Sequence, residues 1–246
     1  MYNISEKEYR QIERIEEDMM RRIFKTGRGC SIYQLYFEAG QLPARILIKR
    51  IKLIFFQYIL TQNEDSLLFT FLVAQKKCPT RGDWFSDVVH ILEEFEIYIS
   101  EEDLKIMPRH RFKIIVKQKA ENAGLRYLKN LQKKCDKGSR ISYSSLELQD
   151  YLHPSSNINV EDQRFLFSLR SEMNILKSNF RRNKTITERF CIKSCKIEID
   201  NEHLVYCKEL NRTSLFRFEH ILNGTLEEKK EALKQVRFNE AIRSKE

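Results

Sequence analysis

Apolar positions recur every three or four residues along most of the chain, which is the spacing of one face of an α-helix. In residues 4–25 this spacing joins Ile12, Ile15, Met19 and Ile23 within a stretch of mixed charge. The pattern predicts an amphipathic helix with these four side chains as its apolar face.

A second helix is predicted from Pro43 to about Thr61, because proline is favoured in the first turn of a helix and the residues after it keep the helical period. The side chains expected on its buried face are Leu47, Ile51, Ile54, Phe55 and Ile59. The basic side chains expected elsewhere on it are Arg45, Lys49, Arg50 and Lys52.

Further helices are predicted from the same period, with starts marked by capping residues such as Asp83 and Ser100. They span residues 65–76, 83–95, a first turn after Ser100, 108–135, 161–177 and a pair within 213–244. Seven glycines and four prolines in 246 residues are too few for the many turns of an all-β sandwich. The predicted fold class is therefore mainly α, a helical bundle-like assembly.

Charge is distributed unevenly around a formal net charge of +9. Residues 85–104 hold seven Asp and Glu and no Lys or Arg, whereas residues 105–190 hold nineteen Lys and Arg against eight Asp and Glu. Such a surplus favours a polyanionic partner, either nucleic acid or an anionic membrane surface. A lysine-rich helix is often only a solvated face. Here the positive charge continues from helix to linker, which favours a surface that contacts the phosphates of RNA or DNA.

The candidate nucleic-acid-binding side chains lie in the predicted helix 108–135 and in the linker after it. They are Lys113, Lys117, Arg126, Lys129, Lys133, Lys134, Lys137, Arg140, Arg181, Arg182, Lys184 and Arg189. The longest apolar run, residues 53–60, is too short to span a bilayer, and the N-terminus has no signal-peptide pattern. We therefore expect no membrane partner and an intracellular location, nuclear or cytoplasmic, with reduced thiols.

Three of the six cysteines and one of the five histidines lie within residues 191–207, near the end of the chain. Cys191, Cys195, His203 and Cys207 follow the pattern C-x3-C-x7-H-x3-C. Zn2+ takes four sulfur or nitrogen ligands in a tetrahedron, and two close pairs of ligands joined by a short turn can supply them. The spacing predicts one Zn2+ site, while buried or free thiols and disulfides stay open as alternatives.

The sequence contains none of the motifs that mark common catalytic sites. It has no Gly-Lys-Ser/Thr phosphate loop, no G-x-S-x-G elbow, no H-E-x-x-H helix and no adjacent aspartates of the kind a two-metal polymerase often uses. The neighbouring acids Glu101, Glu102 and Asp103 follow Ser100 as in the first turn of a helix. The chain is therefore expected not to act as an enzyme by itself.

Four separated segments share a pattern with a known family. They are Leu35 to Pro43 with the basic helix after it, Gly82 to Trp84, Leu169 to Met173 leading to Lys177, Asn179 and Phe180, and the Cys-Cys-His-Cys cluster. Together they resemble the C-terminal third of non-LTR (LINE-like) retrotransposon reverse transcriptases, and the similarity covers nearly the whole chain. The last ligand spacing is x3, whereas x4 is usual in the best-known members.

The resemblance implies a thumb, a helical linker and a CCHC zinc knuckle that hold template RNA and target DNA during target-primed reverse transcription. The chain then divides into a thumb-like region (1–104), a basic linker region (105–190), the knuckle (191–210) and C-terminal helices (211–246). The fingers, the palm and the endonuclease of such proteins have no counterpart here. The chain is expected to be the terminal fragment of a larger RNA-directed DNA polymerase, with the upstream reverse transcriptase domains as its partners.

Two other interpretations stay open at this point. In the first, the chain is a helical interaction protein whose knuckle is a structural staple and whose acidic stretch, residues 85–104, docks a basic partner. In the second, the chain is a retroelement product without function. Retention on an RNA column that falls steeply with salt would separate a nucleic-acid-binding protein from the interaction protein.

Overall fold

The computed structural model describes residues 3–26, 30–78, 82–134, 143, 145–171 and 224–243, without the side chains of residues 235–243. Every regular element within these ranges is helical, which confirms the prediction of a mainly α fold. No helix in the same ranges combines the length and the apolar character that crossing a bilayer requires.

Two compact units make up the chain. Unit 1 comprises residues 1–19 and 42–134, and unit 2 comprises residues 20–41 and 135–246. The division falls within the first helix, α1 (Glu6–Phe24), so that α1 contributes residues to both units. The two units are defined by contacts between residues in the structure. The four regions expected from the sequence are defined by composition and motifs, and they stay predictions.

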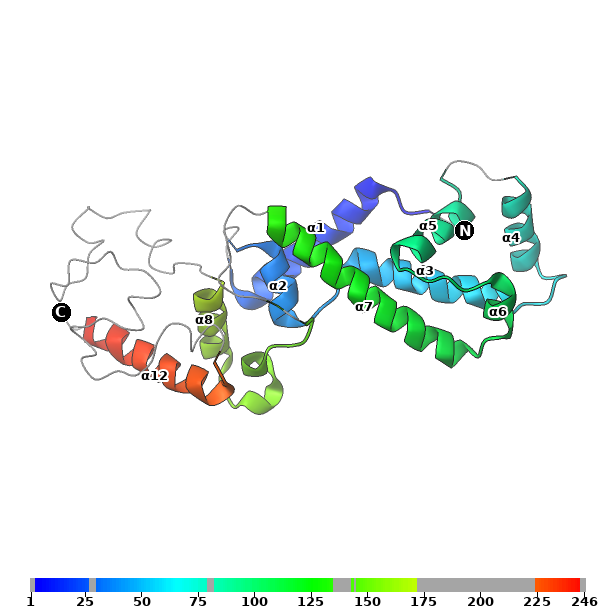
Figure 1. The fold of residues 1–246 in the computed structure, drawn as a ribbon. Helices are drawn as coiled ribbons and strands as arrows, with labels where there is room; N and C mark the ends of the chain where they lie inside the picture. Colours follow the sequence, from blue (N-terminus) through cyan, green and yellow to red (C-terminus); the bar gives the residue numbers. More distant parts are fainter. Residues whose placement is uncertain are drawn as a thin grey trace. The chain divides into compact units, whose positions relative to one another are not determined.

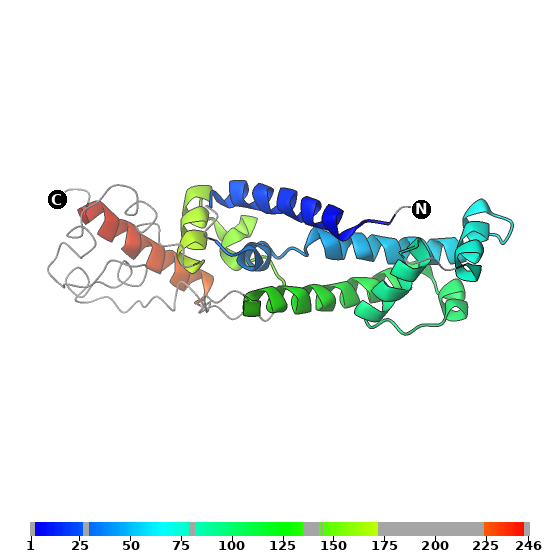
Figure 2. The same ribbon diagram turned by 90° about the horizontal axis from the view of Figure 1, so that it is seen from above.

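Unit 1 is built on two long helices, α3 (Ala44–Leu60) and α7 (Arg109–Lys134), which lie side by side in both views (Figures 1 and 2). Its shorter helices are α4 (Leu67–Lys77), α5 (Trp84–Glu94) and α6 (Glu101–Ile106). All three shorter helices contact α3, which therefore forms the centre of the unit.

The shorter helices begin at capping residues. The side-chain oxygens of Ser66, Asp83 and Ser100 each accept a hydrogen bond from the backbone N–H three residues further on. Such a bond satisfies one of the N–H groups that the first helical turn leaves unpaired. The helix starts predicted at Asp83 and Ser100 are confirmed.

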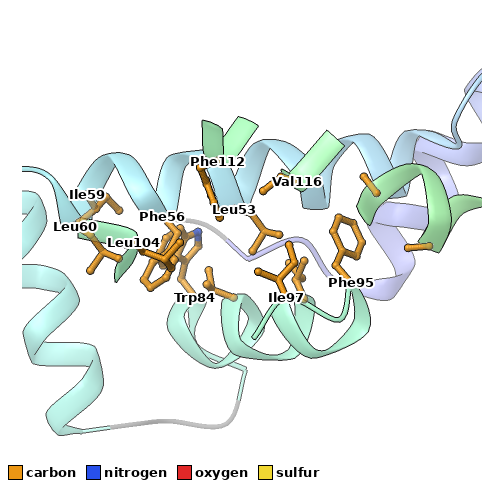
Figure 3. Close-up of a cluster of buried hydrophobic side chains, with 14 of the residues drawn as sticks. Leu53, Phe56, Ile59, Leu60, Trp84, Phe95, Ile97, Leu104, Phe112 and Val116 are labelled. Atoms are coloured by element: carbon orange, nitrogen blue, oxygen red, sulfur yellow. The ribbon is translucent and has the colours of Figure 1, made fainter. Parts of the chain in front are cut away.

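The core of unit 1 lies between α3 and α5, and α7 contributes to it as well (Figure 3). Its largest buried side chains include Leu53, Phe56, Ile59, Trp84, Phe95 and Phe112. Gly124 lets α7 approach the start of α3, because a Cβ at this position would lie 2.2 Å from Cδ2 of Leu42. Burial of these apolar surfaces supplies the main driving force for folding of the unit.

The apolar face predicted for α1 is wrong. Ile15, Met19 and Ile23 are between 59% and 63% exposed, although the helix itself forms as expected. The side turned toward α3 instead carries acids, since Glu16 accepts a hydrogen bond from the backbone N–H of Ala44. α1 therefore packs onto α3 partly through charge, which apolar spacing alone does not reveal.

The buried face predicted for α3 is also wrong in part. Leu47, Ile51 and Phe55 are exposed, whereas Leu53 and Phe56 are buried together with the predicted Ile59. α3 has apolar residues around most of its circumference. The period therefore identifies the helix but not the side that faces the core.

Unit 2 contains the end of α1 and a set of shorter elements. They are α2 (Ile32–Ala39), the 3-10 turns η1 (Asp150–Leu152) and η2 (Pro154–Ser156), α8 (Val160–Arg170) and α12 (Leu226–Arg243). α2 was not predicted, because six of its eight residues are buried in succession and show no helical period. α8 and α12 agree with helices that the sequence predicts.

Gly40 gives a test of the packing in unit 2. It follows α2 with a φ of 61°, and a Cβ on it would lie 2.2 Å from the backbone nitrogen of Leu148. Gly40→Ala is expected to lower the free energy of unfolding by about 3 kcal/mol or more, because the left-handed backbone costs about 1–2 kcal/mol and the overlap adds to it. Urea denaturation followed by circular dichroism measures the loss.

Gly82→Ala is the matched control, because Gly82 also has a positive φ, 81°, but a Cβ there meets nothing within 4 Å. Its free energy of unfolding should fall only by the cost of the left-handed backbone, about 1–2 kcal/mol. Equal losses for the two variants would contradict the close approach of residues 147–148 to Gly40.

Candidate nucleic-acid interface

α7 carries most of the positive charge in unit 1. Its 26 residues include nine Lys and Arg and a single acid, Glu121. Phe112, Val116, Ala120 and Leu128 turn into the core, so that the cations occupy the rest of its circumference. A helix of this length extends for about 39 Å, long enough to run past several phosphates of a nucleic acid.

Six of the predicted nucleic-acid-binding residues lie on α7, and all six are exposed: Lys113, Lys117, Arg126, Lys129, Lys133 and Lys134. Arg126, Lys129 and Lys133 follow one another at spacings of three and four, which places them on one face. The prediction missed Arg109, Arg111 and Lys119 of the same helix, although they carry the same charge in the same period.

Few of these cations are neutralised within the protein. Lys117 lies 4.0 Å from Glu121, and Arg126 lies 3.0 Å from Glu96, both in exposed pairs that contribute little. The other four predicted residues on α7 form no ion pair with any residue in the described ranges. Lys133 and Lys134 lie in the last turn of α7, where positive charge also suits the negative end of the helix dipole.

The cations of α3 are used differently. The guanidinium of Arg45 binds the carboxylates of Glu13 and Glu6, at 2.7 and 3.0 Å, and lies over the rings of Tyr9 and Tyr127. Hydrogen bonds to Glu13 raise the pKa of Arg45, and those to Glu6 add to the effect. Arg45 therefore ties α1, α3 and α7 together and is not available to an external anion.

Acids of the stretch 85–104 pair with four other cations of unit 1. The ion pairs are Asp87 with Lys52, Glu94 with Lys49, Glu96 with Arg126 and Glu101 with Lys76. Asp103 in addition accepts a hydrogen bond from the hydroxyl of Ser100. Most carboxylates of this stretch therefore face cations of the same unit.

The other predicted site residues lie outside the described residues. They are the possible zinc ligands Cys191, Cys195, His203 and Cys207 and the cations Lys137, Arg140, Arg181, Arg182, Lys184 and Arg189. Within the described part of the chain, no cluster of three or more His, Cys, Asp or Glu side chains could hold a metal ion. The Zn2+ site stays a prediction.

Unit 2 contains a buried ion pair that the sequence did not suggest. Arg170 and Glu38, 2% and 0% exposed, lie 3.0 Å apart. The hydroxyls of Tyr143 and Tyr151 each donate a hydrogen bond of 2.7 Å to the same carboxylate. With its oxygens satisfied by a guanidinium and two phenols, Glu38 has a structural role and is not placed for acid–base chemistry.

Burial and the charge of Glu38 set the ionisation of this cluster. Burial raises the pKa of Tyr143 and of Tyr151, and the negative charge of Glu38 raises both further. Burial by itself would lower the pKa of Arg170, but the adjacent carboxylate outweighs it and keeps the pKa above its ordinary value. Arg170 is therefore charged, and both tyrosines are neutral, throughout the physiological range.

The start of α12 joins the same cluster. Lys229 is buried and forms a 2.7 Å ion pair with Asp150, and its ammonium lies 5.9 Å from the centre of the Tyr151 ring. The guanidinium of Arg170 lies 5.6 Å from the centre of that ring. Tyr151 therefore contacts both the last residue of α8 and the first turn of α12.

The apolar neighbours of Glu38 and Arg170 in the sequence are a local indication that both charges are buried. Glu38 follows the run Leu35-Tyr36-Phe37, and Arg170 follows the largely apolar stretch from Phe165 to Leu169 at the end of α8. A single charge within such an apolar run is a candidate for a buried, paired group.

The chain matches no known family profile, no curated protein and no solved structure.

The buried ion pair can be tested by removing one member. Arg170→Met is expected to lower the free energy of unfolding by about 3–5 kcal/mol, because Glu38 would stay buried without its cation. The double variant Glu38→Leu/Arg170→Met should recover much of this loss. Thermal or urea unfolding of the unaltered protein, of Arg170→Met, of Glu38→Leu and of the double variant gives the coupling energy.

Arg10→Ala is the control, since its 3.4 Å pair with Glu6 lies on the surface and contributes about 0.5 kcal/mol or less. A loss for Arg170→Met that is no larger than that of Arg10→Ala would argue against the buried pair.

Proposed function

We propose that the chain binds nucleic acid through the exposed cations of α7 and that it holds the sugar–phosphate backbone instead of reading bases. The observation that carries this proposal is the imbalance on α7, nine Lys and Arg against one acid, with Lys113, Lys129, Lys133 and Lys134 unpaired among the described residues. Lysine and arginine bind phosphates by releasing condensed counterions, and this interaction requires no particular base sequence.

We further propose that this binding serves a non-LTR retrotransposon reverse transcriptase. This role is supported by a resemblance to that family, which lies in the segments 35–43, 82–84 and 169–173 and in the cysteine cluster. In this role the chain positions template RNA and target DNA for target-primed reverse transcription beside the upstream domains. The chemistry of polymerisation and of DNA cleavage belongs to those other domains.

The proposal includes one Zn2+ held by Cys191, Cys195, His203 and Cys207. Thiolate and imidazole groups are the ligands that zinc prefers, and a site with four protein ligands is structural. In this protein the ion would organise the segment next to the cations Arg181, Arg182, Lys184 and Arg189. Its contribution is to the fold of that segment and, through it, to binding.

The alternative, a protein-interaction module that docks a basic partner on residues 85–104, is less favoured. Four of the seven acids in this stretch already pair with Lys49, Lys52, Lys76 and Arg126. A basic partner would have to displace these contacts, whereas a polyanion meets ammonium groups that have no acidic partner in the described chain.

The charge on α7 is tested by the triple variant Lys129→Ala/Lys133→Ala/Lys134→Ala. Its affinity for RNA should fall, and the slope of log K against log salt concentration should decrease by about 0.7 for each lost phosphate contact on a single strand, or about 0.9 on a duplex. Fluorescence anisotropy over a series of KCl concentrations measures both quantities.

The control removes three exposed cations from α1, as Lys7→Ala/Arg10→Ala/Arg14→Ala. It changes the net charge by the same amount and should leave the slope close to that of the unaltered protein. Equal decreases in the two triple variants would mean that net charge, and not α7, determines binding.

The zinc site is tested by metal analysis of the purified chain. One Zn2+ per chain is expected, and Cys195→Ala or His203→Ala should abolish it, because three ligands bind zinc far more weakly than four. Cys78→Ala, which removes an exposed cysteine at the end of α4, is the control and should keep the metal. Unchanged metal content in the first two variants would rule the site out.

A further inference from the structure

The outer side of α3 is apolar. Leu47, Ile51 and Phe55 lie four residues apart and are 38%, 65% and 37% exposed. α3 also contains no acidic residue. A helix on the surface of a globular protein normally shows polar side chains to water, so this apolar stripe departs from the usual arrangement.

The stripe continues into an aromatic pair. Tyr58 lies one turn beyond Phe55, and the two rings are stacked with centroids 6.0 Å apart and planes inclined by 21°. The guanidinium of Arg109, from the start of α7, lies 5.5 Å from the centre of the Tyr58 ring. Flat, partly exposed π surfaces therefore lie next to a fixed positive charge.

Further cations run beside the stripe. The start of α7 meets the end of α3 at Arg109 and Tyr58, and Gly124 of α7 meets Leu42 and Ile46 near the start of α3. The two helices are therefore antiparallel, as Figure 2 also shows. Lys113 and Lys117 follow Arg109 at spacings of four, which continues the row along α3.

Arg50 adds a cation from α3 itself. Unlike Arg45, Lys49 and Lys52, it forms no ion pair with a residue in the described ranges. On a helical projection it lies between the stripe and the side of α3 that faces α7. The acid nearest in sequence to the row on α7, Glu121, pairs with Lys117.

We propose that this surface, the stripe of Leu47, Ile51, Phe55 and Tyr58 with the row of Arg50, Arg109, Lys113 and Lys117, binds single-stranded nucleic acid. The inference rests on the proposed function and names the form of nucleic acid that the protein prefers. Unpaired bases stack on Phe55 and pack against Ile51, while the phosphates meet the cations.

A single strand fits this surface better than a duplex because of what each form exposes. Bases in a duplex are stacked on one another, so their faces cannot reach an apolar stripe on a protein. An unpaired strand offers base faces and phosphates together, and these match the apolar stripe and the row of positive charges. The preference needs no base-edge hydrogen bonds and is therefore tolerant of sequence.

The experiment compares binding of the full chain to a labelled single-stranded RNA and to a duplex of the same length by fluorescence anisotropy. Phe55→Ala should weaken single-strand binding by about fivefold or more, the effect of losing one base–aromatic stack, and should change duplex binding by less than about twofold. Phe55→Leu keeps an apolar side chain against Trp84, 6.0 Å away, and should give the same selective loss without unfolding.

Tyr98→Ala is the matched control, because Tyr98 is an 82% exposed aromatic residue in the loop between α5 and α6. It should change neither affinity. The proposal is overturned if the Phe55 variants weaken single-strand and duplex binding equally. Binding to anionic phospholipid vesicles and to an acidic amphipathic peptide is measured in parallel, and a loss confined to either of these also overturns it.

The proposed function and this inference fail in different ways. If the Phe55 variants leave both affinities unchanged while the triple variant of α7 lowers them, backbone binding stands and the stacking surface is wrong. If the unaltered chain binds neither single strand nor duplex at any salt concentration, both proposals are wrong.

Discussion

Pairing between the cations of α3 and acids from α1 and α5 is the electrostatic constraint that accompanies the apolar core of unit 1. Arg45 is held by Glu13 and Glu6, and Lys49 and Lys52 reach carboxylates on α5. All three cations are at most 15% exposed, so these pairs are less screened by salt than pairs on the open surface. They hold one side of α3 against α1 and α5, while its apolar stripe lies on the outer side.

The same pairing divides the charge of unit 1 into a neutralised part and an open part. Four of the acids between residues 85 and 104 form ion pairs: two with Lys49 and Lys52 of α3, one with Lys76 of α4 and one with Arg126 of α7. α7 then has too few acidic neighbours for its cations. Within the part of unit 1 that the structure describes, the positive charge is therefore not spread evenly but gathers along one helix.

Sequence patterns predicted the helices better than their faces. The period and the caps at Asp83 and Ser100 gave the starts of helices, because both are local properties. The core side of α3 could not be predicted, since it depends on acids far away in the sequence. Likewise the charge surplus identified α7 as a candidate site, but nothing local to Glu38 and Arg170, 132 residues apart, indicates that they meet.

The cluster around Tyr151 bears on the Zn2+ proposal through the chain's connectivity. Arg170 is the last residue of α8 and Lys229 lies in the first turn of α12, and both cations lie within 6 Å of the centre of this one ring. The two ends of the stretch that contains the four possible ligands therefore lie close together. Closing a loop costs entropy that grows with its length. Because the buried contacts of Arg170 with Glu38 and of Lys229 with Asp150 already close this loop, a metal ion bound within it has less of that cost to offset.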